Sequence, residues 1–365
     1  MKLSAQREIF LEPLQAVIGV VERRQTMPIL TNVLLVAREG HLSITATDLE
    51  VELVASSKIN VEQDGEITVP GRKLLDIFRA LPADAKVSVT LDGDRVLIRS
   101  GHSRFTLSTL PAAEFPLVED IDAQVTLTVS QKDAGRLLEK TQFSMAQQDV
   151  RYYLNGILLE AADKTLRAVA TDGHRLALCE VELKKACKGE HQVIVPRKGV
   201  LELLRLLGGE GDISLAIGSN HIRAQVGSIR FTSKLIDGRF PDYRRVIPSA
   251  ESSPLTGDRE VLKQALHRAA ILSNEKYRGI RLDVKGNSIR ILAHNPEHEE
   301  AEEEVAVKYS GEDLEIGFNV NYLLDALSAV DGDQVEVGLI DSNSSCLIME
   351  PGSKSCKDVV MPMRL

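Results

Sequence analysis

The pattern of apolar and polar positions repeats three times along the chain. Its plainest landmark is a short apolar run that leads into one segment in which apolar residues recur at helical spacing. The three examples are VPGRKLLDIFRAL (69–81), VPRKGVLELLRLL (195–207) and FNVNYLLDALSAV (318–330). The Leu-acid pair inside each example falls 126 and then 123 residues after the previous one. A period this constant indicates tandem copies of one domain.

A second landmark keeps the same period. Three segments, which end at Asp48, Asp172 and Asn295, each contain an alternating run, a polar turn and a second alternating run. Alternation of period two on both sides of a turn predicts a β-hairpin. The end points lie 124 and 123 residues apart, so two independent landmarks agree on the repeat.

Each copy is predicted to contain two helices. The first helices are expected at 6–21, 130–147 and 258–273, and the second helices at 71–81, 197–207 and 319–330. We therefore predict an α+β fold made of three tandem copies of a two-helix, antiparallel-sheet domain. The copies are expected at 1–123, 124–252 and 253–365, with linkers near 116–124 and 247–258.

Composition narrows the functional classes. Only 4% of the 365 residues are aromatic and none is Trp, which disfavours stacking platforms for sugars or single-stranded nucleic acid. The four cysteines contain no C-x-x-C pair, so a zinc finger is not expected, and neither a disulfide framework nor a secretory segment is indicated. No apolar run approaches the roughly 20 residues that span a bilayer. We predict a cytoplasmic protein with no metal, no other cofactor and no membrane partner.

The distribution of charge is more informative than its total. The net charge is −9, yet the six predicted helices hold 13 Lys or Arg and 9 Asp or Glu, a net of +4. Lys132, Arg136 and Lys140 form one stripe at i, i+4 and i+8, opposite a face expected to pack on a sheet. A positive helical surface beneath an acidic exterior attracts phosphate. Taken singly, each helix is simply amphipathic, and the helices at 6–21 and 319–330 do not follow the trend.

The stretch VATDGHRLALC (169–179) has the look of a catalytic centre, because an acid, a histidine and a thiol occur close together. Asp172, however, occupies the place that Asp48 has in the first copy, which favours a turn-forming role. A Cys–His dyad needs both groups within hydrogen-bond reach and a third group that orients the base. Nothing in the sequence indicates this for Cys179 and His174, so we expect no catalytic residue.

Several longer segments carry a resemblance to a known family. They are QFSMAQQDVRYYLNG (142–156), ATDGHRLA (170–177), SKLIDGRFPDYRRVIP (233–248), LSNEKYRGIRL (272–282) and the terminal MPMRL. In this order, and with three two-helix repeats, the chain resembles the bacterial DNA polymerase III beta subunits, the sliding clamps, over essentially its whole length. The resemblance implies a non-catalytic processivity factor, a head-to-tail homodimer whose six domains close into a ring around duplex DNA.

The resemblance also implies partners and DNA contacts. The partners would be double-stranded DNA, the replicative polymerase subunit, an ATP-driven clamp loader and other proteins that carry a clamp-binding motif. The chain has no phosphate-binding loop of the G-x-x-x-x-G-K-[ST] type, so ring opening would rely on that separate loader. DNA contacts are implied at Arg24, Arg72, Gln148, Tyr152, Tyr153 and Lys198. Arg side chains and Tyr hydroxyls suit phosphate and sugar, which position the protein without reading sequence.

A cleft for partner peptides is implied between the second and third domains. Its residues would be Leu154, Thr171, Gly173, His174, Arg175, Leu176, Pro241, Arg245, Val246, Asn319, Tyr322, Asn343, Ser345, Val359, Met361, Pro362, Met363 and Arg364. The apolar members form a hollow in which Met adapts to varied ligands. Arg175 and Arg245 suit peptide carbonyls or carboxylates, and Asn343 makes the rim more polar.

A dimer interface is implied between the first domain of one protomer and the third domain of its partner. Basic residues would face the acidic run EHEEAEEE (297–304), and apolar residues would pack between them. The residues concerned are Lys73, Arg95, Arg104, Phe105 and Leu107 on one side, and Ile271, Leu272, Glu299, Glu300, Glu302 and Glu303 on the other. Exposed ion pairs contribute little, so the apolar contacts are expected to dominate affinity while the charges set register.

Two other functions stay open on the sequence alone. One is a repeat-built hydrolase that uses Asp172 and His174. The other is a structural scaffold that does not bind DNA.

Overall fold

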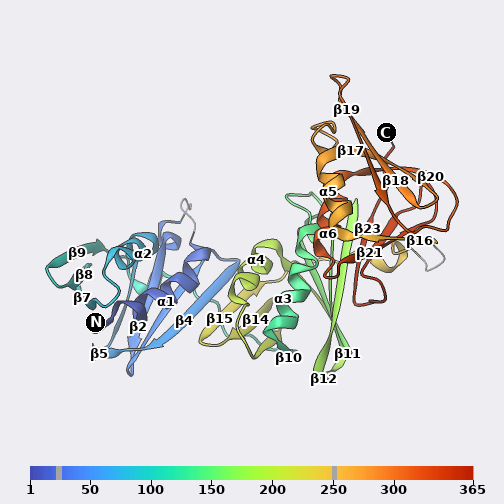
Figure 1. The fold of residues 1–365 in the computed structure, drawn as a ribbon. Coiled ribbons are helices and arrows are strands. Elements are labelled where there is room, and N and C mark those ends of the chain that lie inside the picture. Colours follow the sequence, from blue (N-terminus) through green and yellow to red (C-terminus); the bar gives the residue numbers. More distant parts are fainter. Residues whose placement is uncertain (22–26, 249–252, 365) are drawn as a thin grey trace. The chain divides into compact units, whose positions relative to one another are not determined.

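The protein is described from a computed structural model, which describes residues 1–21, 27–248 and 253–364 (Figure 1). The chain divides into two compact units. Unit 1 comprises Met1–Ala134 and Lys198–Leu235, and unit 2 comprises Gly135–Arg197 and Ile236–Leu365. Each unit therefore combines strands from two consecutive repeats.

Each repeat contains the predicted pair of helices. Over the described residues the α-helices are α1 (Arg7–Val17), α2 (Gly71–Ala80), α3 (Gln131–Glu139), α4 (Arg197–Leu206), α5 (Arg259–Ala270) and α6 (Val320–Ala329). Polar side chains begin several of them: Asp258 accepts from the Val261 N–H ahead of α5, and Ser130 accepts from the Asp133 N–H ahead of α3. None of the described helices is long and apolar enough to cross a membrane.

The predicted helix at 130–147 was wrong in its second half. Helix α3 ends at Glu139, and residues Gln142–Ser144 form a separate 3-10 turn. The Thr141 hydroxyl donates back to the Leu137 carbonyl at 2.7 Å. Such local bonds from Ser and Thr compete with continued helix, and the sequence TQFS supplies two of these residues.

Unit 1 contains two antiparallel sheets. The first has the order β5 (Asn60–Gln63), β1 (Lys2–Gln6), β7 (Lys86–Asp92), β8 (Arg95–Ser100) and β9 (Ser103–Ser108). The second has the order β10 (Val125–Ser130), β13 (Asp212–Ile217), β14 (His221–Val226), β15 (Ile229–Lys234), β4 (Val51–Lys58), β3 (His41–Thr47), β2 (Asn32–Arg38) and β6 (Gly65–Pro70). The pairing of β15 with β4 joins the second repeat to the first within one continuous sheet.

Unit 2 repeats this arrangement with the second and third repeats. One sheet has the order β11 (Gly156–Thr171), β12 (Arg175–Pro196), β23 (Cys356–Val360), β22 (Cys346–Met349), β21 (Gln334–Leu339) and β16 (Ser253–Asp258). The other has the order β19 (Glu300–Ala306), β18 (Ser288–His294), β17 (Gly279–Lys285) and β20 (Leu314–Asn319). Here β12 pairs with β23, so the third repeat continues the sheet of the second.

The predicted hairpins are confirmed in the first and third repeats, where β2 pairs with β3 and β17 pairs with β18. In the second repeat both arms lie within β11. Arg167 Nη1 is 3.3 Å from Glu160 Oε2, although residues seven apart in a straight strand would be about 23 Å apart. The chain therefore reverses between these residues, at Asp163, whose φ of +48° suits a tight turn.

The core lies where the apolar helix faces meet the sheets (Figure 1). In unit 1, Leu14 of α1 and Phe78 of α2 are fully buried with Ile44 and Leu53 of the sheet, and Phe10 stacks on Phe78 at 5.0 Å between ring centroids. In unit 2, the buried side chains of α5 and α6 form one cluster with those of β17, β18 and β20. Val360, the last residue of β23, belongs to the same cluster, so the core of unit 2 also anchors that strand.

Candidate functional site

The segment that looked catalytic is a structural turn. Asp172 Oδ1 accepts hydrogen bonds from the backbone N–H groups two and three residues further on, at 2.9 and 3.1 Å. Asp48 makes the same two bonds in the first repeat, at 2.9 and 2.7 Å. The preceding Thr171 and Thr47 each accept from the N–H two residues on and donate to a carbonyl four residues on. The turn-forming role of Asp172 is therefore confirmed.

Arg175, which follows this turn, is committed to its own chain. Its guanidinium donates to Asp172 at 3.1 Å, to Asp325 at 2.5 Å and to the Phe143 carbonyl at 2.7 Å. The same group lies over the Tyr322 ring, 4.6 Å from its centroid. These contacts fix Arg175 in one wall of the site, and its role in holding the carbonyls or carboxylates of a peptide stays a prediction.

A hollow of about 190 Å³ opens beside this wall, at the end of the β12–β23 ladder. It is lined by Arg151, Leu154, Thr171, Gly173, Arg175, Leu176, Pro241, Asp242, Tyr243, Val246, Val359 and Met361. Leu154, Leu176 and Val359 are buried and make its apolar base, while Met361 is 37% exposed. The Met361 N–H donates to the His174 carbonyl at 2.9 Å, which holds the C-terminal segment along the rim.

Several predicted cleft residues lie outside this hollow. His174 is exposed and faces the Tyr322 ring at 6.4 Å, and Arg245 lines a neighbouring basic hollow instead. Arg245 also pairs with Asp242 at 2.9 Å, with 84% of its side chain exposed. The others that do not line it are Asn319, Tyr322, Asn343, Ser345, Pro362, Met363 and Arg364. Met363 is nevertheless held in place, because its N–H donates to the Gly317 carbonyl at 2.9 Å.

The cationic stripe on α3 differs from its prediction. Lys132 is exposed as expected, but Arg136 and Lys140 both pair with Asp331, which follows α6 in the third repeat. Lys140 also donates to the Ala329 carbonyl at the end of α6. Cations at a helix C-terminus stabilise its free carbonyls, so two of the three charges join repeats within unit 2.

Comparison with known proteins identifies the family. Models of the N-terminal, central and C-terminal domains of the DNA polymerase III beta subunit match residues 1–119, 128–242 and 244–364. The beta sliding clamp of Pseudomonas putida is 56% identical, with both chains covered completely. The chain belongs to the DNA polymerase III beta subunit family.

Solved structures of this family agree with the fold. The DNA polymerase III beta subunit of Pseudomonas aeruginosa is 53% identical and superposes with a TM-score of 0.98 over the whole of both chains. A sliding clamp from the same species, bound to griselimycin, is 54% identical with a TM-score of 0.97 and the same full coverage. The predicted fold class and the predicted function, a non-catalytic sliding clamp of DNA replication, are thereby confirmed.

Membership of the beta subunit family also removes the hydrolase alternative. The Asp172 carboxylate accepts hydrogen bonds from the backbone of the turn and from Arg175. Cys179 forms a disulfide with Cys356 rather than lying beside His174. The cysteine spacing in the sequence did not indicate this disulfide. Among the residues that the structure describes, no group of His, Cys, Asp and Glu side chains is arranged to hold a metal ion.

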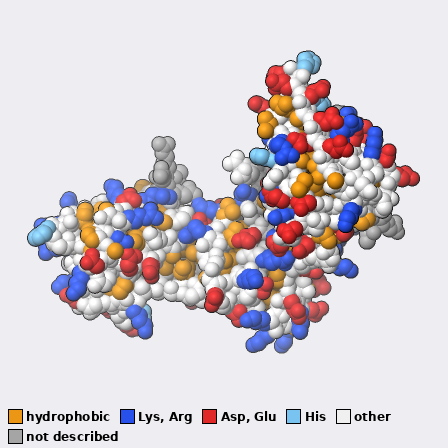
Figure 2. All heavy atoms as spheres, viewed as in Figure 1, with side chains coloured by type: hydrophobic (Ala, Val, Ile, Leu, Met, Phe, Trp, Pro, Cys, Tyr) orange, Lys and Arg blue, Asp and Glu red, His pale blue; other side chains and the backbone are white. Residues whose placement is uncertain are grey.

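Two of the residues predicted to contact DNA, Arg72 and Lys198, form bonds within their own chain. Arg24 lies outside the described residues. Arg72 is exposed on α2 and donates to the Val21 carbonyl at 2.6 Å, and Lys198 pairs with Asp48. Figure 2 shows Lys and Arg side chains gathered over α2, which carries Arg72, Lys73 and Arg79.

In unit 2, Gln148 and two tyrosines belong to one exposed segment. Gln148 has a φ of +55°, and Tyr152 is 58% exposed and lies edge-on to Tyr153. The two tyrosines begin a 3-10 turn (Tyr152–Leu154). The exposure of Tyr152 agrees with the expectation that at least one of them is exposed.

Several of the predicted dimer residues lie on two edge strands. In unit 1, Arg104, Phe105 and Leu107 belong to β9, the edge strand of its sheet, with Arg95 on β8 and Lys73 on α2. Arg95, Arg104 and Lys73 are exposed, Phe105 is partly exposed and Leu107 is buried.

In unit 2 the acidic residues lie on or beside β19, also an edge strand (Figure 2). Glu299 and Glu300 are exposed, whereas Glu303 pairs with Arg268 at 2.8 Å and Glu302 with Arg290 at 3.4 Å. Two of these acidic residues therefore pair within their own chain, and the prediction that the run faces a partner's basic residues stays a prediction. Ile271, which follows α5, is 73% exposed, and Leu272 is partly exposed.

Three residues of the hollow were missed by the sequence reading: Arg151, Asp242 and Tyr243. Arg151 lies against Gly173, where a Cβ atom would come within 3.0 Å of its Nη1. Hydrogen bonds from Arg151 to Asp149 lower the pKa of that carboxyl to about 2, so the pair keeps its charge at neutral pH. The only signal for this contact was the glycine itself, whose φ of +90° suits residues without a Cβ.

Proposed function

We propose that this chain acts as the sliding clamp of its replication machinery and tethers partner proteins through the hollow at the β12–β23 ladder. Tethering works through effective concentration, because a polymerase held beside its template rebinds before it diffuses away. The partners we propose are the replicative polymerase subunit, an ATP-driven clamp loader and other proteins with a clamp-binding motif. The chain would work in the cytoplasm, where bacterial DNA is replicated.

The observation that carries this proposal is the chemistry of the hollow. Its base is apolar and its rim is polar, with Arg151, Asp242 and the exposed Met361 around buried Leu176 and Val359. An apolar pocket with a few placed polar groups is typical of a site for short peptide segments. Griselimycin, which the solved P. aeruginosa clamp binds, is the probe we propose for the same hollow.

For the ring, we propose a head-to-tail homodimer in which β9 of one protomer pairs with β19 of the other. Both are edge strands, which present unpaired backbone groups that favour sheet extension. Arg104 lies on β9 and Glu300 on β19, so the two edges are complementary in charge. Exposed Ile271 would supply the apolar contact.

For DNA, we propose weak contacts through Arg72, Lys198, Gln148, Tyr152 and Tyr153. A clamp held by topology must slide, and strong phosphate contacts would oppose sliding. Lys198 pairs with Asp48 and Arg72 bonds to a backbone carbonyl, which moderates both positive charges. We expect Arg72→Ala to weaken DNA binding equally for all sequences and to lower the salt slope by about 1.

The experiment that tests the clamp function compares circular with linear DNA. After loading with clamp loader and ATP onto a nicked circular plasmid, the protein should stay bound through gel filtration at high salt. Cutting the plasmid should release it. Equal retention on both forms would indicate direct binding, and no retention on either would favour a scaffold that does not bind DNA.

The dimer is tested by the double variant Ile271→Asp and Leu272→Asp, which should sediment as a monomer. The matched control is Val261→Asp, because Val261 is an apolar residue that is 50% exposed on α5 and lies outside the proposed interface. A double variant that remains dimeric shows that the interface lies elsewhere.

A further inference from the structure

A disulfide joins two repeats beside the candidate cleft. Cys179 lies on β12 of the second repeat and Cys356 begins β23 of the third, 177 residues later. The two residues are directly opposite in the ladder, with Cα atoms 4.1 Å apart. The next pair is hydrogen-bonded, since the Glu180 N–H donates to the Ser355 carbonyl at 2.8 Å. The cysteines therefore form a pair of the close, non-hydrogen-bonded kind, whose side chains project to the same face.

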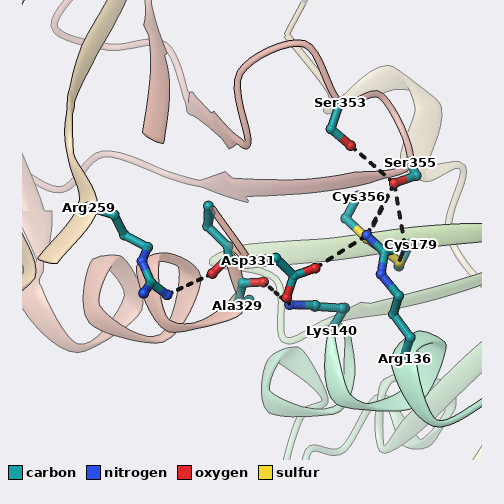
Figure 3. Close-up of polar contacts among 10 residues, drawn as sticks. Arg136, Lys140, Cys179, Arg259, Ala329, Asp331, Ser353, Ser355 and Cys356 are labelled. Carbon is teal, nitrogen blue, oxygen red and sulfur yellow. Dashed lines mark hydrogen bonds and ion pairs between the residues drawn. A yellow bond between two sulfur atoms is a disulfide. The ribbon is translucent and has the colours of Figure 1, made fainter. Parts of the chain in front are cut away.

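Basic and polar groups surround the two sulfur atoms (Figure 3). Arg136 Nη1 lies 3.6 Å from Cys179 Sγ, and Ser355 Oγ lies 4.0 Å from Cys356 Sγ. Arg136 is held in this position by Asp331 and by the Ser355 hydroxyl. A guanidinium beside a thiol favours the thiolate, which is the species that takes part in disulfide exchange.

The other two cysteines have the opposite surroundings. Cys187 and Cys346 are buried and free, and burial raises the pKa of the Cys346 thiol to about 12. Burial likewise raises the pKa of Cys187. A raised pKa lowers the fraction of reactive thiolate, so Cys187 and Cys346 should react more slowly than the Cys179–Cys356 pair. They can therefore serve as controls in the experiments below.

We propose that Cys179 and Cys356 form a reversible, redox-controlled clasp that holds β23 in register on β12 and so stabilises the peptide cleft at the other end of the ladder. The ladder runs from Cys179↔Cys356 to Arg175↔Val360, and Leu176↔Val359 lies within it. A cross-link at one end prevents the short strand β23 from slipping or detaching. The part that concerns the cleft rests on the proposed function, whereas the part that concerns the disulfide does not.

The oxidant is a low-molecular-weight disulfide such as oxidised glutathione. Cys356 is partly exposed and Cys179 is fully buried, so the Cys356 thiolate attacks first and releases one small thiol. The Cys179 thiolate then attacks Cys356 Sγ in the mixed disulfide and releases the second small thiol. Two protein thiols lose two protons and two electrons, and one small disulfide is reduced to two thiols. Reduced glutathione in excess reverses the sequence.

The first test measures the clasp directly on the full-length protein in buffers of graded oxidised and reduced glutathione. Thiols titrated after unfolding in denaturant should fall from four to two as the buffer becomes oxidising, and peptide mapping without reductant should recover the Cys179–Cys356 cross-link. The oxidised form should melt about 5 °C higher than the reduced form. This shift should vanish in Cys356→Ser and persist in Cys187→Ser.

Two results would overturn the clasp: four titratable thiols at every glutathione ratio, or a cross-link that forms without any change in melting temperature. The wild-type comparison needs no substitution, so a variant that folds poorly does not affect it.

The second test asks whether the clasp reaches the cleft. Binding of fluorescent griselimycin is measured in urea near the midpoint at which the reduced protein unfolds. Because half of the reduced protein is folded at this midpoint, the oxidised protein should bind about twofold tighter than the reduced protein, and Cys356→Ser should bind alike in both buffers. Equal affinity of the two wild-type forms would overturn the link to the cleft. Failure of both forms to bind without urea would instead count against the proposed function, while the thiol and melting results would stand.

Discussion

The two junctions between consecutive repeats share one backbone plan and differ in side-chain chemistry. In unit 1, β4 pairs with β15, and in unit 2, β12 pairs with β23; each ladder runs through five register pairs. Each ladder begins just after the same turn, made by Asp48 in unit 1 and by Asp172 in unit 2. Any difference in function between the junctions therefore comes from the residues placed on this common frame.

The two junctions differ most clearly at the second register pair, counted from the turn. This pair is covered by another segment of the chain in unit 1 and faces a hollow in unit 2. In unit 1 this pair is Glu52 with Thr232, both buried, and Glu52 accepts the Val118 N–H at 2.9 Å. A segment of the chain itself thus bonds to one carboxylate oxygen of this junction. In unit 2 the pair is Leu176 with Val359, which offers only apolar surface to the hollow. The two junctions therefore place different side-chain pairs on one backbone frame, polar in unit 1 and apolar in unit 2.

The third and fifth pairs extend the contrast. Unit 1 places buried Phe231 at the third pair, where unit 2 has Asp358, which is 6% exposed and has one carboxylate oxygen without a hydrogen-bond partner. The fifth pair is Ala55 with Ile229 in unit 1 and the disulfide-forming cysteines in unit 2. Both junctions therefore carry a buried acid, Glu52 in unit 1 and Asp358 in unit 2, and the junction with the cleft also carries a covalent link.

The largest effect on ligand affinity should come from removing the C-terminal segment that forms part of the rim of the unit 2 hollow. Deleting residues 361–365 takes away Met361, its bond to the His174 carbonyl and the anchored Met363. We expect griselimycin affinity to fall about 100-fold or more, since several contacts are lost together. Fluorescence anisotropy measures the affinity, and a thermal melt that changes little shows that the fold is kept. Affinity within about threefold of wild type would place the ligand elsewhere.

The buried acid gives the next effect. Burial raises the pKa of Asp358 well above its usual range, so the folded protein keeps a proton that the unfolded chain releases above about pH 4. The free energy of unfolding should therefore decline as pH rises from there towards the folded pKa. Asp358→Asn should flatten this decline and raise the free energy of unfolding by about 1–3 kcal/mol at pH 8. Denaturant unfolding at several pH values measures both, and an unchanged pH profile would contradict the assignment.

A smaller effect is expected from exchanging the second-pair residues. Val359→Thr keeps the shape of the side chain and adds a hydroxyl to the apolar base, which should lower griselimycin affinity about 10-fold. Its matched control is Thr232→Val in unit 1, which removes the hydroxyl that accepts Arg223 Nε at 3.2 Å. That control should bind the ligand as wild type does. Equal losses in both variants, measured by anisotropy, would mean that the two junctions are not distinguished by these residues.

The smallest effect, on the free energy of unfolding, is expected from substitutions in the turn that Asp48 and Asp172 form in the two units. Gly173 has a φ of +90° and Leu49, its counterpart, has a φ of +77°. Gly173→Ala should lower the free energy of unfolding by about 1–2 kcal/mol, because a Cβ is strained there and meets Arg151. Leu49→Gly should change it by less than about 1 kcal/mol in either direction, as relief of strain opposes the entropy of the unfolded chain. Urea titration of both variants distinguishes these outcomes.

Local features of the fold were predictable because they depend on short spacings. Period-two alternation located the hairpins, and helical spacing located α2, α4 and α6 closely. The role of Asp172 followed from its match with Asp48. The end of α3 was missed because the Thr141 hydroxyl competes with the helix locally, which apolar spacing does not register.

Features that depend on distant contacts were not predictable from the sequence. From the sequence, Lys140 is expected to be an exposed cation. In the structure it forms an ion pair with Asp331, which lies 191 residues further along the chain. The sequence shows no sign that the Arg175 guanidinium contacts Asp325 and Tyr322. Cys179 shows no sign of a partner 177 residues away. In each case the partner lies in the third repeat, at a separation along the chain that no local pattern encodes.

The most direct test of this account is methyl NMR of the labelled protein during titration with griselimycin. We expect the signals of Leu176, Val359 and Met361 to shift in a saturable way, while those of Val51 and Leu53 in the equivalent ladder of unit 1 stay in place. Shifts confined to the unit 1 ladder, or equal shifts in both, would contradict the claim that one junction is filled and the other open.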